Sequence, residues 1–339
     1  MSNPDPRVAV VGATGVVGGT MLTLLEERHF PAREIVPFAS RRSEGRQLDG
    51  YGPVRALTDG ADIDGFDIAL FSAGAGVSRE WAPRFVQTGA TVIDNSSAFR
   101  RDPEVPLVVS EINPHAVKSH HKLISNPNCS TMAMVVALGP IHREAGIERL
   151  VAATYQSVSG TGRRAVDELE AQAHASLHGM DMPAPEVYPE PIAFNVIGAA
   201  GSFADGDDHT DEERKMMFET RKILEDENIG VAVTCVRVPV RVSHSIAVNI
   251  QTCEPITAER AQELLNAAPG VIVEDVPTPL RAAGRDEVFV GRIRRDESHP
   301  RGLSLFVVGD NLRKGAATNA IQIAELLTAG ATSEAARVA

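Results

Sequence analysis

The feature that most constrains the fold is an apolar run followed by closely spaced glycines near the start of the chain. Residues 7–11, RVAVV, are typical of a parallel strand buried on both faces of a sheet. The segment 12–18, GATGVVG, follows and leads into a helical pattern. In this order, glycines let the backbone approach a pyrophosphate, which the amides at the helix N-terminus bind. A tight turn with close helix packing is the alternative, and the N-terminal position favours a dinucleotide site.

The end of the second predicted strand, residues 35–39, indicates which dinucleotide would bind. Ser40, Arg41, Arg42 and Ser43 follow that strand directly. An NAD site usually has an acidic residue here for the ribose 2′-hydroxyl, whereas arginines and serines suit a 2′-phosphate. The segment therefore favours NADP, with a solvated basic turn as the alternative.

Further strand-and-turn units extend this half of the chain. Residues 66–71 are predicted to form a strand followed by a turn at 72–76, and residues 90–93 a strand followed by a segment ending in Arg100. Short apolar runs at 107–109 and just before Cys129 are predicted to complete the sheet. Ligands of such sheets lie outside the carboxyl ends of the strands. We therefore expect the glycine turn, the 72–76 turn, Arg100 and Cys129 at that edge.

After Cys129 the pattern becomes a mixture of helices and strands. The segments 230–242 and 245–252 are predicted to pair as strands, and 179–210 to form a long surface loop. The amphipathic segment 315–327 could be a helix that returns to the first domain. The remaining predictions are strands at 150–158, near 271 and at 303–308, and helices at 163–178, 215–226 and 257–267.

The stretch 123–132, LISNPNCSTM, places a cysteine at a predicted strand-to-helix junction. Pro127 restricts the backbone, and either Asn126 or Asn128 can cap the helix that follows. A thiol at Cys129 would lie at the positive end of a helix dipole, which favours the thiolate, and the free amides there could hold an oxyanion. The alternative is a small buried apolar residue, as most free cysteines are.

Composition limits the classes of function. The chain has 339 residues, enough for two domains, and a formal net charge of −12 that opposes binding to nucleic acid and anionic membranes. It lacks an apolar run of membrane-spanning length and an apolar signal core at its start. Cys235 and Cys253 are predicted to pack within strands, and the cysteines lack CxxC spacing, so a cytoplasmic location is expected. His174 and His178 have metal-like spacing, but a solvent-facing pair is favoured and no metal is expected.

Eight motifs in order give the chain a family resemblance: GATGVVG (12–18), FSAGAGVS (71–78), VIDNSSAFR (92–100), SNPNCST (125–131), YQSVSGTG (155–162), FETRKIL (218–224), RVPVRVSHS (237–245) and GDNLRKGAA (309–317). Together they resemble the aspartate-β-semialdehyde dehydrogenase family. The resemblance implies an α/β fold with a Rossmann-type NADP-binding domain, residues 1–127 plus 313–339. It also implies an α+β catalytic and dimerisation domain, residues 128–312, with a mixed or antiparallel sheet.

The resemblance also implies an activity. Family members convert L-aspartyl 4-phosphate and NADPH to aspartate semialdehyde, NADP and phosphate, without metal or flavin. This step serves the synthesis of lysine through diaminopimelate, and of methionine, threonine and isoleucine. A homodimer or a dimer of dimers is expected.

Roles carried over by position concern the catalytic and substrate-binding residues. Cys129 would be the nucleophile, Gln156 would orient the acyl intermediate, and His244 would be the general acid/base. Arg237 would bind the substrate carboxylate and Glu219 its ammonium group. The phosphate would be bound by Arg100, Asn128 and Lys222. From the residues alone, Glu219 and Lys222 could instead be a surface ion pair, and Arg237 could pair with an internal carboxylate.

The residues expected to bind the cofactor belong to four segments. They are Gly12, Thr14, Gly15, Val16, Val17, Gly18, Ser40, Arg41, Ser72, Ala73, Ser159, Gly160 and Asn311.

Two rival functions remain at this stage. N-acetyl-γ-glutamyl-phosphate reductase shares the architecture, but its nucleophile motif typically has Gly before Cys, whereas Asn128 precedes Cys129 here. A non-catalytic NADP-binding scaffold or regulator would be expected to lack Cys129, Gln156 or His244, and all three are present.

Overall fold

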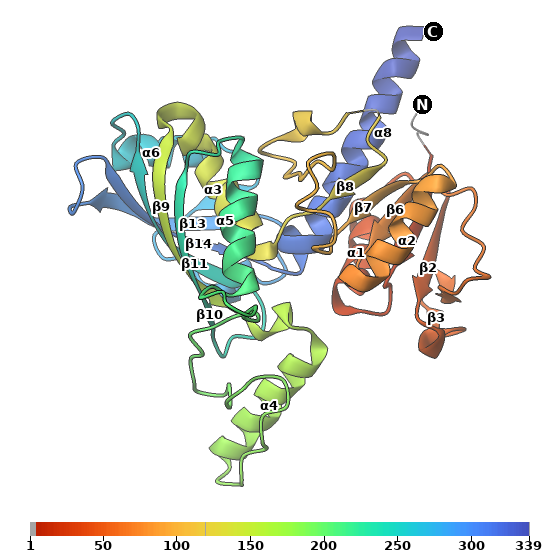
Figure 1. Ribbon diagram of the computed structural model, residues 1–339, viewed down its shortest axis with the longest axis horizontal. Helices are drawn as coiled ribbons and strands as arrows, with labels where there is room; N and C mark the ends of the chain where they lie inside the picture. Colours follow the sequence, from red (N-terminus) through yellow and green to blue (C-terminus); the bar gives the residue numbers. More distant parts are fainter. Residues whose placement is uncertain (1–4, 119, 339) are drawn as a thin grey trace. The chain divides into compact units, whose positions relative to one another are not determined.

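The computed structural model describes residues 5–118 and 120–338, which form two compact units. One unit contains residues 1–127 and 316–339, and the other contains residues 128–315. A π-helical segment, η4 (Arg313–Thr318), spans the point where the chain passes from the second unit to the first (Figure 1). Among the described residues, no helix combines the length and the apolar composition that a bilayer crossing requires.

The first unit is built on a parallel sheet. Within the described residues its strands are β5 (Arg55–Ala56), β2 (Glu34–Ala39), β1 (Arg7–Val11), β6 (Ile68–Phe71), β7 (Thr91–Asp94) and β8 (Leu123–Ser125), in that spatial order. Each neighbouring pair is parallel. A small hairpin of β3 (Gln47–Leu48) and β4 (Gly52–Pro53), and the short helices η1 (Arg41–Ser43) and η2 (Pro114–Ala116), complete the connections.

Helices cover both faces of this sheet. On one face, α1 (Val16–Glu27) and α8 (Asn319–Val338) bury Leu25 and Ile321 against alternate residues of β1 and β6. On the other face, α2 (Ala75–Gln87) buries Trp81 and Phe85 beside Phe38. Because both faces are covered, the strands are apolar on both sides, and the predicted Rossmann-type architecture is confirmed.

One predicted strand of this unit is wrong. Residues 107–109 form only a single bridge, between Leu107 and Ser125. The reason is the side chain of Asn113, whose Nδ2 donates to the Leu107 carbonyl and whose Oδ1 accepts from the Val109 amide. These bonds turn the chain where a strand would have continued.

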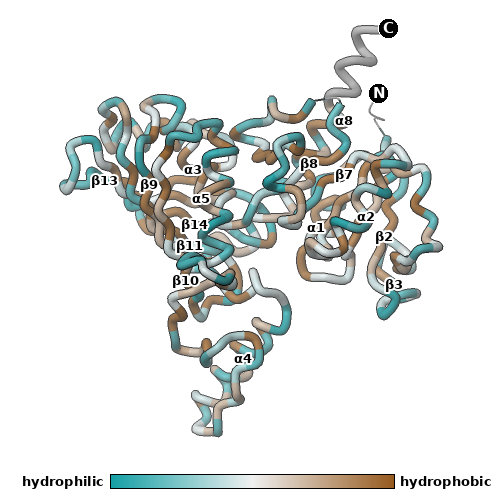
Figure 2. The backbone as a smooth tube through the Cα atoms, in the orientation of Figure 1, coloured by the Kyte–Doolittle hydropathy of each residue, from teal (hydrophilic) through white to brown (hydrophobic). Residues whose placement is uncertain are grey.

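The second unit has a mixed sheet, with hydrophobic stretches along its strands in Figure 2. The order, among the described residues, is β10 (Gly230–Arg237), β9 (Ile147–Gln156), β11 (His244–Thr252), β14 (Gly302–Gly309), β13 (Val288–Asp296) and β12 (Val271–Val273). β10 is parallel to β9 and β12 to β13, while the other pairs are antiparallel. The predicted mixed sheet is therefore confirmed.

Helices cover one face of the second sheet. They are α3 (Cys129–Ala145), α5 (Asp211–Leu224) and α6 (Ala258–Asn266), and a short helix, α7 (Pro279–Ala282), packs near β14. A short turn, η3 (Val158–Gly160), leads from β9 into α4 (Arg163–Leu177), which projects away from the sheet (Figure 1). Residues 178–210 contain no helix or regular strand, as predicted for the loop, although Ile192 and Ala193 are buried against α4.

The structure corrects one prediction in this unit and adds one strand. The segments 230–242 and 245–252 do not pair, because β9 lies between β10 and β11. The connection crosses the end of β9, where the carbonyls of Val240 and Arg241 accept from Val158 and Ser159. β13 was not predicted, since its bulge between Gly291 and Arg294 interrupts the period of two.

Candidate active site

Three polar side chains meet at one end of the second sheet. Gln156 ends β9, Arg237 ends β10 and His244 begins β11. Gln156 is paired with Arg237, and the pairing of Tyr155 with Ser245 places His244 on the other side of Gln156. All three share the helix-covered face of the sheet and are at most 6% exposed.

Each of these side chains has a buried polar atom without a hydrogen-bond partner in the described part of the chain. The atoms are Gln156 Nε2, Arg237 Nε and His244 Nε2. Arg237 Nη1 donates to the Ser157 carbonyl at 2.7 Å, but the guanidinium makes no ion pair with any described carboxylate. The alternative of an internal Asp or Glu partner is therefore not observed. Buried polar groups normally have partners, so three neighbouring exceptions indicate a ligand site.

Cys129 is the first residue of α3 and is partly exposed. Asn128 is the N-cap, with Oδ1 accepting from the amides of Ser130 (3.0 Å) and Thr131 (3.2 Å). Asn126 is not the cap, because its Oδ1 accepts from Asn319 Nδ2 instead. The thiol therefore lies at the amide end of a 17-residue helix, as the nucleophile hypothesis requires.

Close contacts place this helix start against the strand ends. A Cβ added to Gly315 would lie 2.9 Å from Cys129 Cβ. Gly309, which pairs with His244, would bring a Cβ to 3.1 Å from Ala133, one turn after Cys129. The start of α3 therefore packs on η4 and on β14 beside His244.

Carboxylates of α5 hold the residue before the nucleophile. Glu219 Oε2 accepts from the Asn128 amide at 2.7 Å and is 1% exposed. Glu212 Oε2 accepts from Asn128 Nδ2, also at 2.7 Å. Glu219 is thus buried and not at the surface, and Lys222, half-buried one turn later, lies with Nζ 5.8 Å from the Phe218 ring centroid. The polar groups of the Asn128 side chain have partners within the chain, so its predicted phosphate contact stays a prediction.

His244 is held from one side and open on the other. Its Nδ1 lies 3.0 Å from both the amide nitrogen and the hydroxyl oxygen of Ser157. Burial, and secondarily the charge of Arg237, lowers the pKa of His244 to about 3, against the weaker effect of the Ser243 backbone. A Cβ added to Gly160 would lie 3.1 Å from His244 Nε2 and 3.4 Å from Arg237 Nη1. His244 is therefore neutral at physiological pH.

The other two cysteines have different environments. Cys235 is fully buried, and burial raises the pKa of its thiol to about 12, so it packs as predicted. Cys253 is exposed and lies just beyond β11, so its predicted place inside a strand is wrong. The strand ends at Thr252, whose hydroxyl donates to the Glu254 carbonyl and turns the chain.

The first unit has a cavity of about 590 Å³ at the carboxyl ends of its central strands. Six of the residues predicted to bind the cofactor line it: Gly12, Thr14, Gly15, Ser40, Ser72 and Ala73. Gly12 has φ +89°, and a Cβ on Gly18 would lie 2.1 Å from the Gly12 carbonyl oxygen. The loop therefore requires glycine at both positions, as a dinucleotide-binding turn does.

The remaining predicted cofactor and phosphate residues are placed as follows. Val16 and Val17 begin α1, and Arg41 is exposed in η1, with no ion pair among the described residues. Arg100 is buried in the first unit and donates to the Asn95 carbonyl at 2.9 Å. Ser159, Gly160 and Asn311 lie in the second unit around His244.

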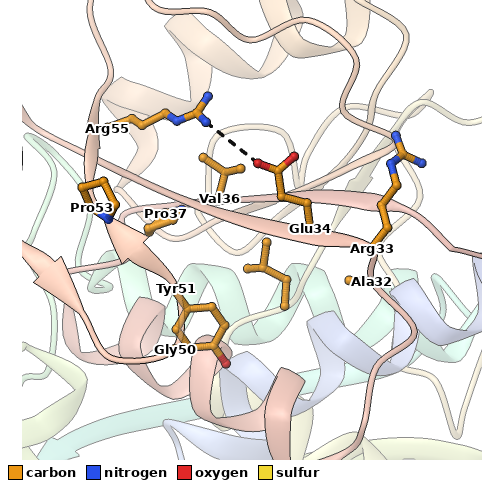
Figure 3. A pocket seen from close by; sticks show the side chains of 10 residues that line it. Ala32, Arg33, Glu34, Val36, Pro37, Gly50, Tyr51, Pro53 and Arg55 are labelled. Carbon is orange, nitrogen blue, oxygen red and sulfur yellow. Dashed lines mark ion pairs between the residues drawn. The ribbon is translucent and has the colours of Figure 1, made fainter.

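A second cavity of the first unit, about 510 Å³, lies along the first half of β2 (Figure 3). Glu34 at its wall pairs with Arg7 at 2.6 Å and faces Arg55 at 3.9 Å. Tyr51 donates to the Leu22 carbonyl at 2.6 Å. The cavity is at the strand end opposite the glycine loop, and its remaining charged residue, Arg33, pairs with Asp67 at 3.2 Å. It is not part of the dinucleotide site.

Comparisons with known proteins identify the family. The family models described as "Semialdehyde dehydrogenase, NAD binding domain" and "Semialdehyde dehydrogenase, dimerisation domain" match residues 7–120 and 138–314. The aspartate-semialdehyde dehydrogenase of Aquifex aeolicus is 54% identical over 332 residues, covering 95% of this chain and 97% of that protein. The chain belongs to the aspartate-semialdehyde dehydrogenase family.

Other members of the aspartate-semialdehyde dehydrogenase family agree with this. The protein of Streptomyces akiyoshiensis is 53% identical over 335 residues, covering 95% of this chain and 98% of that one. The crystal structure of aspartate semialdehyde dehydrogenase II from Vibrio cholerae, complexed with ASA, has a TM-score of 0.92 at 47% identity, with 95% and 98% coverage. The chain is therefore an oxidoreductase that acts on an aldehyde group and uses a nicotinamide cofactor.

Some residues at this family site were not found from the sequence. Ser157 contacts His244, Glu212 contacts Asn128, and Tyr188 lies with its ring centroid 5.9 Å from the Arg237 guanidinium carbon. Ser157 directly follows Gln156, and its position next to a predicted site residue could have indicated that it belongs to the site. Glu212 and Tyr188 had none, because they approach the site only through tertiary contacts.

Proposed function

We propose that this chain catalyses the NADPH-dependent reductive dephosphorylation of L-aspartyl 4-phosphate to L-aspartate 4-semialdehyde. The observation that carries the proposal is the group of unpartnered buried atoms on Gln156, Arg237 and His244, beside the helix start that bears Cys129. The relatives named above support the choice of substrate. The reaction would serve the synthesis of lysine, methionine, threonine and isoleucine in the cytoplasm.

The first step is attack by Cys129 on the acyl carbon. The thiolate forms the C–S bond of a thioester, and the C–O bond to phosphate breaks. The positive end of the α3 dipole favours the thiolate. Because the amides of Ser130 and Thr131 already donate to Asn128 Oδ1, stabilisation of the developing oxyanion falls to side-chain donors. Gln156 Nε2 is free to donate to the acyl oxygen and so to orient the intermediate.

The second step is reduction of the thioester. The glycine loop and the cavity beside it fit a dinucleotide, and the bound nicotinamide supplies the hydride. Negative charge develops on the former carbonyl oxygen, where His244 acts as acid/base partner. When the C–S bond breaks, the sulfur of Cys129 leaves as a thiolate and is ready for another cycle.

Charged residues account for substrate recognition. The Arg237 guanidinium has free donor capacity for a bidentate carboxylate contact. Glu219 would bind the ammonium group, and Arg100, Asn128 and Lys222 would bind phosphate. Ser40 and Arg41 would bind the 2′-phosphate, which makes NADP the preferred cofactor.

We also propose a homodimer, or a dimer of dimers, formed through the open face of the second sheet. Among the described residues the longer helices α3, α5 and α6 cover the other face, and the short helix α7 covers only the part of this face around Phe289 and Val308. On the open face Tyr155 is 40% exposed, and Ala153, Ala247 and Phe306 are partly exposed. A broad apolar sheet face of this kind needs a partner, and a second copy matches the family's dimerisation domain.

The test of the activity is phosphate-dependent NADP reduction. We expect turnover with aspartate semialdehyde and much slower turnover with N-acetylglutamate semialdehyde. The reverse preference would indicate N-acetyl-γ-glutamyl-phosphate reductase. Tight NADP binding without turnover of either would indicate a scaffold.

Replacing the nucleophile tests the mechanism. Cys129→Ala should abolish turnover, because no thioester can form, while NADP affinity measured by calorimetry should stay unchanged. Cys235→Ala is the matched control, since that thiol is buried and should not react. Substantial activity in Cys129→Ala would rule out the covalent route.

A further inference from the structure

The ring of His244 receives a hydrogen bond that determines where its proton lies. The Ser157 amide nitrogen is 3.0 Å from Nδ1. A backbone N–H can only donate, so Nδ1 must present a lone pair to it. In a neutral imidazole the proton then lies on Nε2.

A second layer of bonds holds Ser157. Its hydroxyl oxygen lies 3.0 Å from His244 Nδ1 and 3.1 Å from Asn311 Oδ1. The orientation of the Asn311 amide is set from two sides, because Ser243 N–H donates to Oδ1 at 2.9 Å and Nδ2 donates to Ser159 Oγ at 2.9 Å. All of these side chains are at most 5% exposed. Asn311 therefore presents its oxygen, and not its nitrogen, to Ser157.

We infer that Ser157 and Asn311 are positioning residues for His244. The Ser157 amide holds the neutral, Nε2-protonated tautomer, and the bond from the Ser157 hydroxyl to Asn311 Oδ1 fixes the position of that amide, so that Nε2 faces the reacting oxygen. The inference rests on the proposed function and deepens it. It also reassigns Asn311, whose side-chain oxygen and nitrogen are occupied within the chain, from cofactor contact to support of the imidazole.

The open side of the ring agrees with this arrangement. Nε2 is fully buried and has no partner in the described residues, and Gly160 leaves the space in front of it. A protonated Nε2 there is a donor aimed at the ligand site. The nearby positive charge of Arg237 favours the neutral ring, and Glu219 on α5 faces Asn128 instead.

This tautomer suffices for the reduction. Hydride addition forms the C–H bond and turns the thioester oxygen into an oxyanion, to which Nε2–H donates. The oxygen lone pair then re-forms C=O, the C–S bond breaks, and its electron pair returns to the Cys129 sulfur. Atoms and charge balance, because His244 shares this proton with the oxyanion as an acid and takes it back as a base when C=O re-forms.

The direct test is the imidazole of the intact enzyme with NADP bound and no substrate. Proton–nitrogen correlation spectra of ¹⁵N-histidine-labelled protein, with the signal assigned by its loss in His244→Asn, should show the proton on Nε2 at neutral pH. A proton on Nδ1 would overturn the inference. Because this readout needs no turnover, it stands or fails separately from the proposed reaction.

Variants test the two supporting residues. Ser157→Ala and Asn311→Ala should each lower kcat about tenfold or more. A positioned acid–base group accelerates a reaction about 100- to 10,000-fold, and poorer positioning should lose part of that acceleration. The KM for the acyl phosphate and the affinity for NADP should change less than about twofold. The double variant should be no worse than the poorer single one, because both act through one chain of bonds.

Ser176→Ala is the matched control. Its side chain is exposed on α4 and is not among the groups that contact His244, so its loss should leave kcat and the imidazole spectrum unchanged. Any of three results would refute the positioning role. They are an unchanged kcat in Ser157→Ala, additive losses of kcat in the double variant, and a defect of Asn311→Ala that is confined to NADP affinity.

Discussion

Arg237 combines near-complete burial with a guanidinium that finds no carboxylate among the described residues. Its Nη1 donates to the Ser157 carbonyl, and its backbone bonds in both directions with Ile197 of the long loop. The loop therefore adds a short edge to the sheet where Arg237 lies. This support holds the side chain in place for an anionic ligand.

Arg237→Lys should raise the KM for the acyl substrate at least about tenfold, because a single ammonium cannot reproduce a bidentate contact. The effect on kcat should be smaller, and steady-state kinetics separate the two. Arg241→Lys, on an arginine whose side chain is 70% exposed, is the control. An unchanged KM in Arg237→Lys would remove the carboxylate role.

Gly160 offers a second test at the residue scale. Gly160→Ala would place a methyl carbon about 3.1 Å from His244 Nε2, in the space assigned to substrate. We expect a clear loss of kcat with little change in the unfolding midpoint. Gly198→Ala is the control, since nothing lies within 4 Å of its added Cβ. Equal activity of both variants would contradict the position of the reacting oxygen.

At the scale of elements, two helix starts carry the chemistry, and each is held in a different way. The start of α1 packs on the glycine loop because Gly12 and Gly18 have no side chains to hold the backbones apart. The start of α3 is held by the Asn128 cap and by carboxylates from α5. α5 is itself secured by a capping box in which Thr210 and Glu213 exchange hydrogen bonds.

Two adjacent glycines in α1 test the first of these starts. A Cβ on Gly18 would lie 2.1 Å from the Gly12 carbonyl oxygen, whereas one on Gly19 meets nothing within 4 Å. Gly18→Ala should destabilise the protein by about 1–3 kcal/mol or more and weaken NADP binding, because backbone must move. Gly19→Ala should be neutral or slightly stabilising. Denaturant unfolding measures the stability of each variant, and calorimetry measures its affinity for NADP. Equal stability and equal affinity of the two variants would contradict the proposed packing.

At the scale of the whole molecule, the second sheet has one face covered by α3, α5 and α6 and one face that only α7 covers in part. Tyr155 packs its ring 6.1 Å from that of Phe306 on the open face. The alternation of β9 therefore directs Gln156 to the active site and Tyr155 to the proposed partner.

Tyr155→Arg should shift the protein from dimer to monomer in sedimentation velocity, because two copies would bring unpaired charges into an apolar interface. Leu326→Arg, at a residue that is 37% exposed on α8 of the first unit, should leave the dimer intact. Dimers that persist in Tyr155→Arg at low protein concentration would place the interface elsewhere.

The site shows where inference from sequence ends. The helix start at Cys129 and its possible asparagine caps were predictable, because caps act within a few residues. The residues that hold His244 in place were not predictable, since Ser157 and Asn311 lie 87 and 67 residues away from it along the chain. The roles assigned to the site residues stay predictions until the variants are measured.

The sequence by itself determined the family, the fold class and most helices and strands. These depend on local signals: the glycine loop tolerates no side chain, and apolar spacing gives a helix or strand its buried face. Only the tertiary structure decided that β9 separates β10 from β11, that Glu219 is buried against Asn128, and which nitrogen of His244 faces the ligand site. The physical reason is that an alternating strand carries the same pattern whichever strand it joins, and a polar side chain acquires its partner only when distant segments meet.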